Sequence, residues 1–137
     1  MSSLLIQIAT MVLPHTTVVG DLLIEEGRIS NIQPGGGIIA EGQVQTIDAT
    51  GLHLLPGIID PQVHFRDPGQ PEKEDLYTGS CAAASGGVTS FLDMPNNVPS
   101  QTTLQSMHEK IATGNRRCVT NFGSVSYTHL RAHETDS

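Results

Sequence analysis

Residues 57–69 read GIIDPQVHFRDPG, and this stretch decides the fold class. Its apolar start is typical of a parallel strand that is buried on both faces of a sheet. Side chains on a strand alternate between its two faces, so Gln62, His64 and Arg66 are expected to share one face. The stretch therefore predicts an α/β fold in which polar groups gather at the end of a buried strand.

The segments that follow this strand alternate between helix and strand. Glu74 and Asp75 favour the start of a helix after a proline-containing loop, and Gly86 with Gly87 predicts where that helix ends. Residues 88–94, VTSFLDM, then predict a second strand. The order strand, helix, strand is typical of a parallel sheet in an α/β fold.

A second helix and a third strand are predicted further along the chain. Thr102 or Thr103 can cap a helix, and Gly114 can end it. Residues 118–122, CVTNF, predict the third strand. The apolar face of the second helix is expected to consist of Leu104, Met107 and Ile111.

Residues 1–56 have an all-β pattern. Short β-branched or alternating runs are separated by turn residues, with Glu26 and Gly27 suited to a two-residue hairpin turn. The Pro-Gly-Gly-Gly run at 34–37 predicts a loop. We expect a small sheet or part of a β-sandwich here, before an α/β portion at 57–123.

Composition and charge exclude several classes of partner. Fourteen acidic and seven scattered basic residues give a net charge of -7, whereas a nucleic-acid surface needs clustered Lys and Arg. No run approaches the ~18 apolar residues of a membrane span, and the N-terminus lacks the basic region of a secretory signal. Cys81 and Cys118 lack a metal-binding spacing and are expected to be reduced and buried. We expect a soluble cytoplasmic protein with no nucleic-acid or membrane partner.

The predicted strand end at His64 and Arg66 is a candidate ligand site. Ligands of α/β folds bind where loops leave the carboxyl ends of the strands. A neutral imidazole can bind a metal there, and a guanidinium can hold a carboxylate through two hydrogen bonds. The alternatives are a structural His64 and an ion pair of Arg66 with Asp67 or a helix terminus. Asp60 can likewise brace the strand and take no part in catalysis.

A second polar cluster, DMPNNVPS at 93–100, leaves the next apolar strand. Because the carboxyl ends of adjacent parallel strands share one edge, Asn96 can present its amide to the same crevice. Asparagine beside proline is also a common turn former, which is the alternative interpretation of Asn96.

Residues 124–137 break the patterns seen before them. Residues 125–135 are identical, position by position, to one reading frame of a widely used transposase sequencing adapter. We therefore expect a non-native tail and leave it out of the fold prediction. His129 and His133, although spaced as a helical metal pair, are not expected to bind metal.

Four motifs occur in a fixed order along residues 64–96. They are His-x-Arg-Asp-Pro-Gly, Lys-Glu-Asp, Gly-Gly-Val-Thr and Met-Pro-Asn. Together with the segment before them, they resemble the long-chain dihydroorotases of the amidohydrolase superfamily, and the resemblance covers residues 16–123.

This resemblance implies a fold and a function. Residues 57–123 would be the first βα units of an incomplete TIM (β/α)8 barrel, preceded by part of a small β-sandwich. The implied enzyme binds one or two zinc ions and reversibly hydrolyses the cyclic amide of dihydroorotate to N-carbamoyl-aspartate in pyrimidine biosynthesis. By position, His64 matches a zinc ligand, and Arg66 and Asn96 match the pair that binds the substrate carboxylate.

Gln62 departs from the family pattern, because the family's strand usually ends in His-x-His. A glutamine oxygen suits zinc poorly, so the sequence leaves open a two-metal enzyme, a mono-metal enzyme and a non-catalytic paralogue that serves as an assembly module. An allantoinase or hydantoinase is a further alternative, although these relatives tend to lack an arginine at the position of Arg66.

Length is the second departure from the family. A (β/α)8 barrel takes about 250 residues, so this chain would be an N-terminal fragment of a longer parent and inactive by itself. The general base and the later metal ligands would then lie outside it. The sequence leaves the oligomeric state of the parent open.

Overall fold

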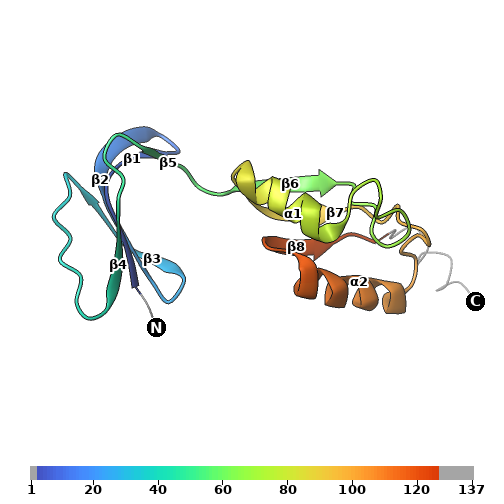
Figure 1. Ribbon diagram of the computed structural model, residues 1–137. Helices are drawn as coiled ribbons and strands as arrows, with labels where there is room; N and C mark the ends of the chain where they lie inside the picture. The colour runs from blue at the N-terminus through green and yellow to red at the C-terminus, as the bar shows by residue number, and fades with distance from the viewer. Residues whose placement is uncertain (1–2, 127–137) are drawn as a thin grey trace, which may run out of the picture. The chain divides into compact units, whose positions relative to one another are not determined.

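The computed structural model describes residues 3–126, and the chain divides into two compact units, Met1–Pro56 and Gly57–Ser137 (Figure 1). Most of the tail predicted to be non-native, including His129 and His133, lies outside the described residues. None of the helices within residues 3–126 has both the length and the apolar composition of a membrane span.

The first unit contains a five-stranded sheet. Its strands are β1 (Ser3–Leu13), β2 (Thr16–Glu25), β3 (Arg28–Pro34), β4 (Val44–Asp48) and β5 (His53–Leu54). The order is β3-β2-β1-β4, and β5 also pairs with β1. β2 is antiparallel to β1 and β3, whereas β4 and β5 run parallel to β1. One buried core cluster of this unit contains Ala9, Met11, Leu22 and Ala49, and Leu5 and Leu23 are buried as well.

The turn between β2 and β3 confirms the hairpin expected at Glu26 and Gly27. Both residues have positive φ angles, 52° and 74°. Two consecutive residues of positive φ form the turn whose twist matches that of the flanking antiparallel strands. The loop expected at 34–37 begins one residue later than predicted, because Pro34 is the last residue of β3 and the three glycines follow it.

A buried carboxylate, Asp21 on β2, holds two irregular segments of the first unit. Its Oδ1 accepts a hydrogen bond of 2.9 Å from the backbone N–H of Ile8, at the bulge of β1 where the φ angle is 55°. Its Oδ2 accepts from the N–H groups of Gly37 and Ile38, at 2.8 and 3.1 Å. These bonds, that of Ile8 first, lower the pKa of Asp21 from its usual range although burial acts to raise it.

Asp21→Asn is therefore expected to destabilise the first unit by about 3 kcal/mol, because an amide cannot accept from all three backbone donors. In the unsubstituted chain, Asp21 has a lowered pKa. The stabilisation by its carboxylate is therefore present above the unfolded-state pKa and is lost as pH falls through the folded-state pKa. Urea unfolding at pH 7 and at acidic pH measures both effects. Glu41→Gln, an exposed carboxylate in the same unit, is the control. Equal losses in the two variants would contradict this role for Asp21.

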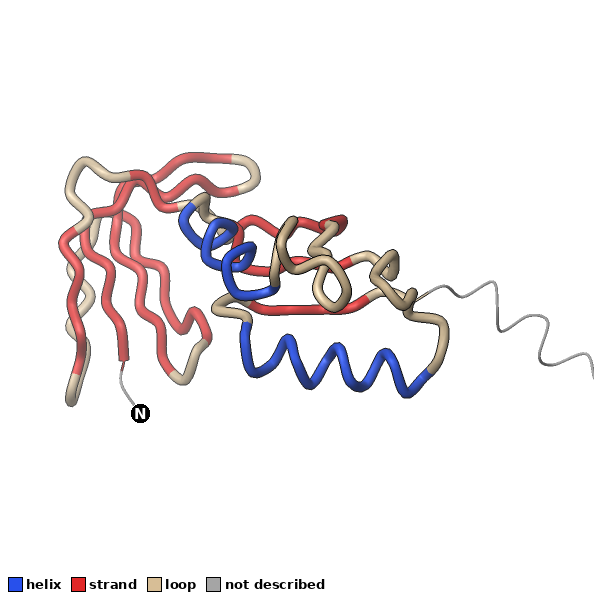
Figure 2. The backbone as a smooth tube through the Cα atoms, turned by 45° about the vertical axis from the view of Figure 1, so that its right-hand side comes forward, coloured by secondary structure: helices blue, strands red, loops and turns tan. Residues whose placement is uncertain are grey.

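Within residues 57–126, the second unit forms a three-stranded parallel sheet with two helices (Figures 1 and 2). Its elements are β6 (Ile58–Val63), α1 (Leu76–Ser85), β7 (Val88–Asp93), α2 (Leu104–Arg117) and β8 (Asn121–Ser124). The strand order is β6-β7-β8, and both pairs are parallel. The predicted alternation of strands and helices in an α/β fold is confirmed.

An aromatic layer joins this sheet to its helices. The ring of Phe91 on β7 lies edge-on to those of Phe65 and Phe122, with centroid distances of 4.8 and 5.5 Å. A Cβ atom on Gly79 of α1 would lie 2.7 Å from the Phe65 ring, and one on Gly114 of α2 would lie 2.3 Å from the Phe122 ring. The two glycines therefore let both helices approach the aromatic layer closely.

The second helix differs from its prediction. Thr103 caps it as expected, but Gly114 lies inside the helix, which continues to Arg117. A glycine is required at position 114 because the helix packs closely against Phe122. Gly114 does not adopt the left-handed backbone conformation that would end the helix. The predicted apolar face is also wrong, because Leu104 is 60% exposed and the buried residues of the helix are Lys110 and Gly114.

Strand β6 also differs from its prediction, since it is not buried on both faces within the described structure. Ile58 and Ile59 are 55% and 66% exposed, and Leu92 on the neighbouring β7 is 41% exposed. Phe91, the residue before Leu92, is buried in the aromatic layer. In residues 57–126, therefore, helices cover the aromatic face of the sheet and apolar side chains remain exposed at Ile58, Ile59 and Leu92.

Candidate active site

The predicted site residues follow the carboxyl ends of two neighbouring strands. β6 ends at Val63, which pairs with Asp93, the last residue of β7. His64 and Arg66 therefore lie just beyond the strand, not within it as the alternation pattern assumed. Asn96 lies three residues beyond the end of β7.

The structure brings His64 and Asn96 together. The Nδ1 atom of the His64 ring lies 3.0 Å from the Oδ1 atom of Asn96. An amide oxygen only accepts hydrogen bonds, so this contact requires a proton on Nδ1, and in a neutral ring with that proton the lone pair is on Nε2. A ring nitrogen that can bind a metal or a proton is therefore held at the strand end.

Arg66 is held through its backbone. Its N–H donates to the carbonyl of Glu74 at 3.0 Å, and its own carbonyl accepts from the N–H of Gln70 at 2.7 Å. Its side chain is partly buried and forms no hydrogen bond or ion pair with another residue of the described range 3–126. The alternative pairing with Asp67 is not formed, because that carboxylate binds the guanidinium of Arg117 instead.

Arg117 fixes the loop that contains Arg66. Besides Asp67, its guanidinium binds the carboxylate of Asp75, the cap residue of α1, at 3.2 Å. Hydrogen bonds, first that of the Thr78 N–H, lower the pKa of Asp75, and the charge of Arg117 contributes to this. A residue near the end of α2 thus ties both ends of the loop between β6 and α1.

Asp60 and Gln62 have local roles at the end of β6. The Oδ1 atom of Asp60 accepts a hydrogen bond of 3.0 Å from the N–H of Gln62, which is the bracing role weighed for this aspartate. Gln62 itself is exposed.

A buried polar network behind His64 was not predicted from the sequence. Lys110 of α2 is 2% exposed, and its ammonium pairs with the fully buried carboxylate of Asp93. It also donates to Oδ1 of the buried Asn97 at 2.6 Å and to the carbonyl of Met94 at 3.4 Å. Burial raises the pKa of Asp93 and lowers that of Lys110, and in each case their mutual attraction opposes the shift.

One signal in the sequence could have found this network. Lys110 lies three residues after Met107 and four before Gly114, on the side of α2 that packs inward. A lone cation on the inward side of a helix needs a buried anion, and Asp93 at the end of an apolar strand is a candidate.

The described residues do not form a complete metal site. No group of three or more His, Cys, Asp or Glu side chains within residues 3–126 is arranged to hold a metal ion. His64 supplies one imidazole, whereas zinc sites in proteins use three or four ligands. Any further ligands would have to come from outside the described part of the chain.

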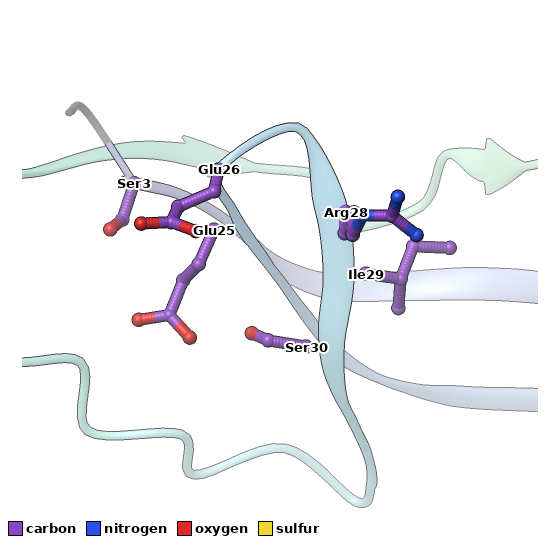
Figure 3. A pocket seen from close by; sticks show the side chains of 6 residues that line it. All are labelled: Ser3, Glu25, Glu26, Arg28, Ile29 and Ser30. Atoms are coloured by element: carbon purple, nitrogen blue, oxygen red, sulfur yellow. The ribbon is translucent and has the colours of Figure 1, made fainter.

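Two open hollows lie away from these strand ends. One, of about 700 Å³, is in the first unit, where Figure 3 shows Glu25, Glu26 and Arg28 around it. The other, of about 450 Å³, lies at the amino-terminal ends of β7 and β8, away from the carboxyl ends that hold the candidate site. It is lined by Ala84, Val88, Thr89 and residues 118–121. Neither contains a candidate site residue.

Comparison with known proteins identifies the class of this chain. Residues 53–136 match the amidohydrolase family, and because this is more than half of the chain, the chain belongs to that family. It is 41% identical to the dihydroorotase of Methanosarcina acetivorans over 103 residues, which cover 75% of this chain and 22% of that protein. It is 38% identical to the allantoinase of Deinococcus radiodurans over 121 residues, which cover 88% of this chain and 26% of that protein.

The fold has a counterpart among solved structures. The L-hydantoinase (dihydropyrimidinase) of Arthrobacter aurescens superimposes with a TM-score of 0.79 and 25% identity, covering 96% of this chain and 31% of that one. The chain thus spans about a quarter of the length of the two curated relatives and less than a third of this structure. The resemblance to dihydroorotases of the amidohydrolase superfamily is confirmed.

Proposed function

We propose that the protein containing this chain hydrolyses a cyclic amide whose ring carries a carboxylate, and that its substrate is dihydroorotate. The reaction is the reversible opening of that ring to N-carbamoyl-aspartate, a step of pyrimidine biosynthesis. The observation that carries this proposal is the 3.0 Å contact between His64 and Asn96 at adjacent strand ends, with Arg66 two residues beyond His64.

Each of the three side chains has a role in this proposal. The guanidinium of Arg66 binds the substrate carboxylate, and Asn96 assists through its Nδ2 donor while its Oδ1 accepts from His64. His64 is one zinc ligand, through Nε2, and its bond to Asn96 orients the ring as partners of metal-bound histidines do. Zinc, when bound, would lower the pKa of a water molecule so that hydroxide forms near neutral pH.

The parallel sheet of the second unit would be part of a larger barrel in the longer protein. Three parallel strands with a helix after each of the first two fit the first βα units of a TIM barrel, in which ligands bind at the carboxyl ends of the strands. The remaining strands, the general base and the further zinc ligands would belong to the longer protein. In that barrel, the exposed Ile58, Ile59 and Leu92 would be covered by later elements.

Two other candidate functions have support. The 38% identity to an allantoinase lies within the 38–45% found for dihydroorotases, and it favours a cyclic amide without a carboxylate at this place. Gln62, at a position where the family's strand usually has a histidine, favours a non-catalytic paralogue that serves in assembly. Arg66 favours hydrolysis of dihydroorotate over a neutral cyclic amide and over a non-catalytic role, because the carboxylate of dihydroorotate can pair with the guanidinium charge.

The test uses the full-length protein, purified with zinc. Ring closure of N-carbamoyl-aspartate is followed by liquid chromatography, with allantoin and hydantoin offered separately for hydrolysis. We expect turnover of N-carbamoyl-aspartate and little of the other two. Turnover of allantoin or hydantoin alone would favour the second candidate, and no turnover combined with tight binding of a protein partner would favour the third.

A further inference from the structure

Phe65, which lies between His64 and Arg66, is held by hydrogen bonds at both of its backbone groups. Its N–H donates to Oδ1 of Asp93 at 2.9 Å, and its carbonyl accepts from Nδ2 of Asn97 at 3.1 Å. Asp93 and Asn97 are 0% and 3% exposed. The direction in which the chain leaves β6, and with it the position of both flanking side chains, depends on these two buried groups.

Both groups are in turn held by one cation. The ammonium of Lys110 pairs with the second carboxylate oxygen of Asp93 and donates to Oδ1 of Asn97 at 2.6 Å. Asp93 is held by a hydrogen bond on one side and an ion pair on the other, and Asn97 by a hydrogen bond on each side, so neither side chain can rotate without breaking a buried polar contact, which is costly. Lys110 of α2 is thereby linked, through Asp93 and Asn97, to the backbone of Phe65 after β6.

The same cation brackets Asn96. The Lys110 ammonium donates at 3.4 Å to the carbonyl of Met94, which lies two residues before Asn96. It also donates to the side chain of Asn97, the residue after Asn96. Both partners of the contact between His64 and Asn96 are therefore adjacent to backbone that this network holds. Within residues 3–126, Lys110 forms no hydrogen bond with either of these two side chains, so its effect on them is indirect.

We propose that Lys110 is a positioning residue for the candidate active site, fixing His64 and Asn96 in their mutual orientation through Asp93 and Asn97. This inference rests on the proposed function for its consequence in catalysis. Its structural content, the orientation of the His64 ring, can be measured without any activity. Loss of such indirect partners typically lowers activity by about 10–100-fold, because reacting groups shift while the fold remains.

The first experiment observes the imidazole directly. Long-range 1H–15N NMR spectra of the metal-free chain at pH 8 report which ring nitrogen of His64 carries the proton. We expect the Nδ1-protonated form in the parent chain and a mixture of both forms in Lys110→Met, which keeps an unbranched side chain but removes the ammonium. Lys73→Met is the matched control, because Lys73 is exposed and its ammonium binds only Gln70 among the described residues. It should leave the spectrum unchanged.

A second variant guards against a simple failure to fold. In Lys110→Met with Asp93→Asn, no buried charge is left without a partner, while residue 93 can still accept from the N–H of Phe65. Retained contacts between the rings of Phe65, Phe91 and Phe122 show that the unit is folded. An unchanged His64 spectrum in a folded variant, single or double, would overturn the proposal.

The second experiment measures kinetics in the full-length protein. Lys110→Met is expected to lower kcat/KM for dihydroorotate by about 10–100-fold, mainly through kcat, while Lys73→Met has no effect. If the parent protein turns over no cyclic amide, the proposed function fails but the NMR result still decides the positioning role. If the parent is active and Lys110→Met changes neither kcat nor the His64 spectrum, the positioning role alone fails.

Discussion

Replacing Arg66 by alanine in the full-length protein is expected to lower kcat/KM for dihydroorotate by about 100-fold. Hydrogen bonds to a charged group contribute about 1.5–3 kcal/mol, and 1.36 kcal/mol corresponds to a factor of ten in rate. The guanidinium forms no bond with another side chain in the described range, so its removal leaves no unpaired partner there. The expected loss is therefore one of substrate binding, while the fold is retained.

The decisive comparison for Arg66→Ala is between substrates. A cyclic amide without the carboxylate should lose less than about threefold, because it has no charge for the guanidinium to bind. Arg116→Ala is the matched control, since Arg116 is exposed on α2 and its described side-chain contact is with Thr113 at 3.2 Å. Equal losses for carboxylate-bearing and neutral rings would exclude Arg66 as the carboxylate-binding residue.

The largest loss of stability is expected for Lys110→Met. Removing one partner of a buried ion pair typically costs about 3–5 kcal/mol, because the other charge stays buried without compensation. Here the remaining group is the carboxylate of Asp93, which is 0% exposed. Urea unfolding of the unsubstituted chain and of the variant at pH 8 measures this loss in the free energy of unfolding.

The pH dependence of this loss identifies its cause. Burial raises the pKa of Asp93, and the hydrogen bond and the charge of Lys110 are the main effects that lower it. In the variant, burial still raises the pKa of Asp93, but Lys110 no longer lowers it. The folded variant then binds a proton more readily than the unfolded chain, and its stability rises as pH falls through the raised folded-state pKa. We expect a smaller deficit relative to the parent at pH 5 than at pH 8.

The double variant, Lys110→Met with Asp93→Asn, separates charge from packing. It keeps the neighbouring titratable groups His64, Asp67 and Cys118 but carries no charge at residue 93. It should be more stable than the single variant at pH 8, with a deficit that no longer depends on pH. A single variant with the same deficit at pH 5 and pH 8 would show that lost packing, not the unpaired carboxylate, accounts for the effect.

Local features of the fold were predicted well from the sequence. The hairpin at Glu26 and Gly27, the start of α1 directly after Asp75 and the cap of α2 at Thr103 all lie where residue type predicted them. Backbone conformation and capping depend on residues within one turn of the chain, so their signals are present in short windows of sequence.

The contact between His64 and Asn96 was also predictable, although 32 residues separate the two. Each follows an apolar strand, and adjacent parallel strands place their carboxyl ends at one edge of a sheet. The predicted end of α2 at Gly114 and its apolar face were wrong because the helix meets Phe122, a residue whose position depends on the sheet.

The sequence by itself determined the order of strands and helices, their caps and turns, and which polar side chains lie at the strand ends. These properties arise from local conformational preference and from the repeat of side chains along an element. Only the tertiary structure decided that Lys110 and Asp21 are buried and which groups they bind. Such roles depend on contacts between residues far apart in the chain, and a charged side chain is stable inside the protein only where the fold supplies its partners.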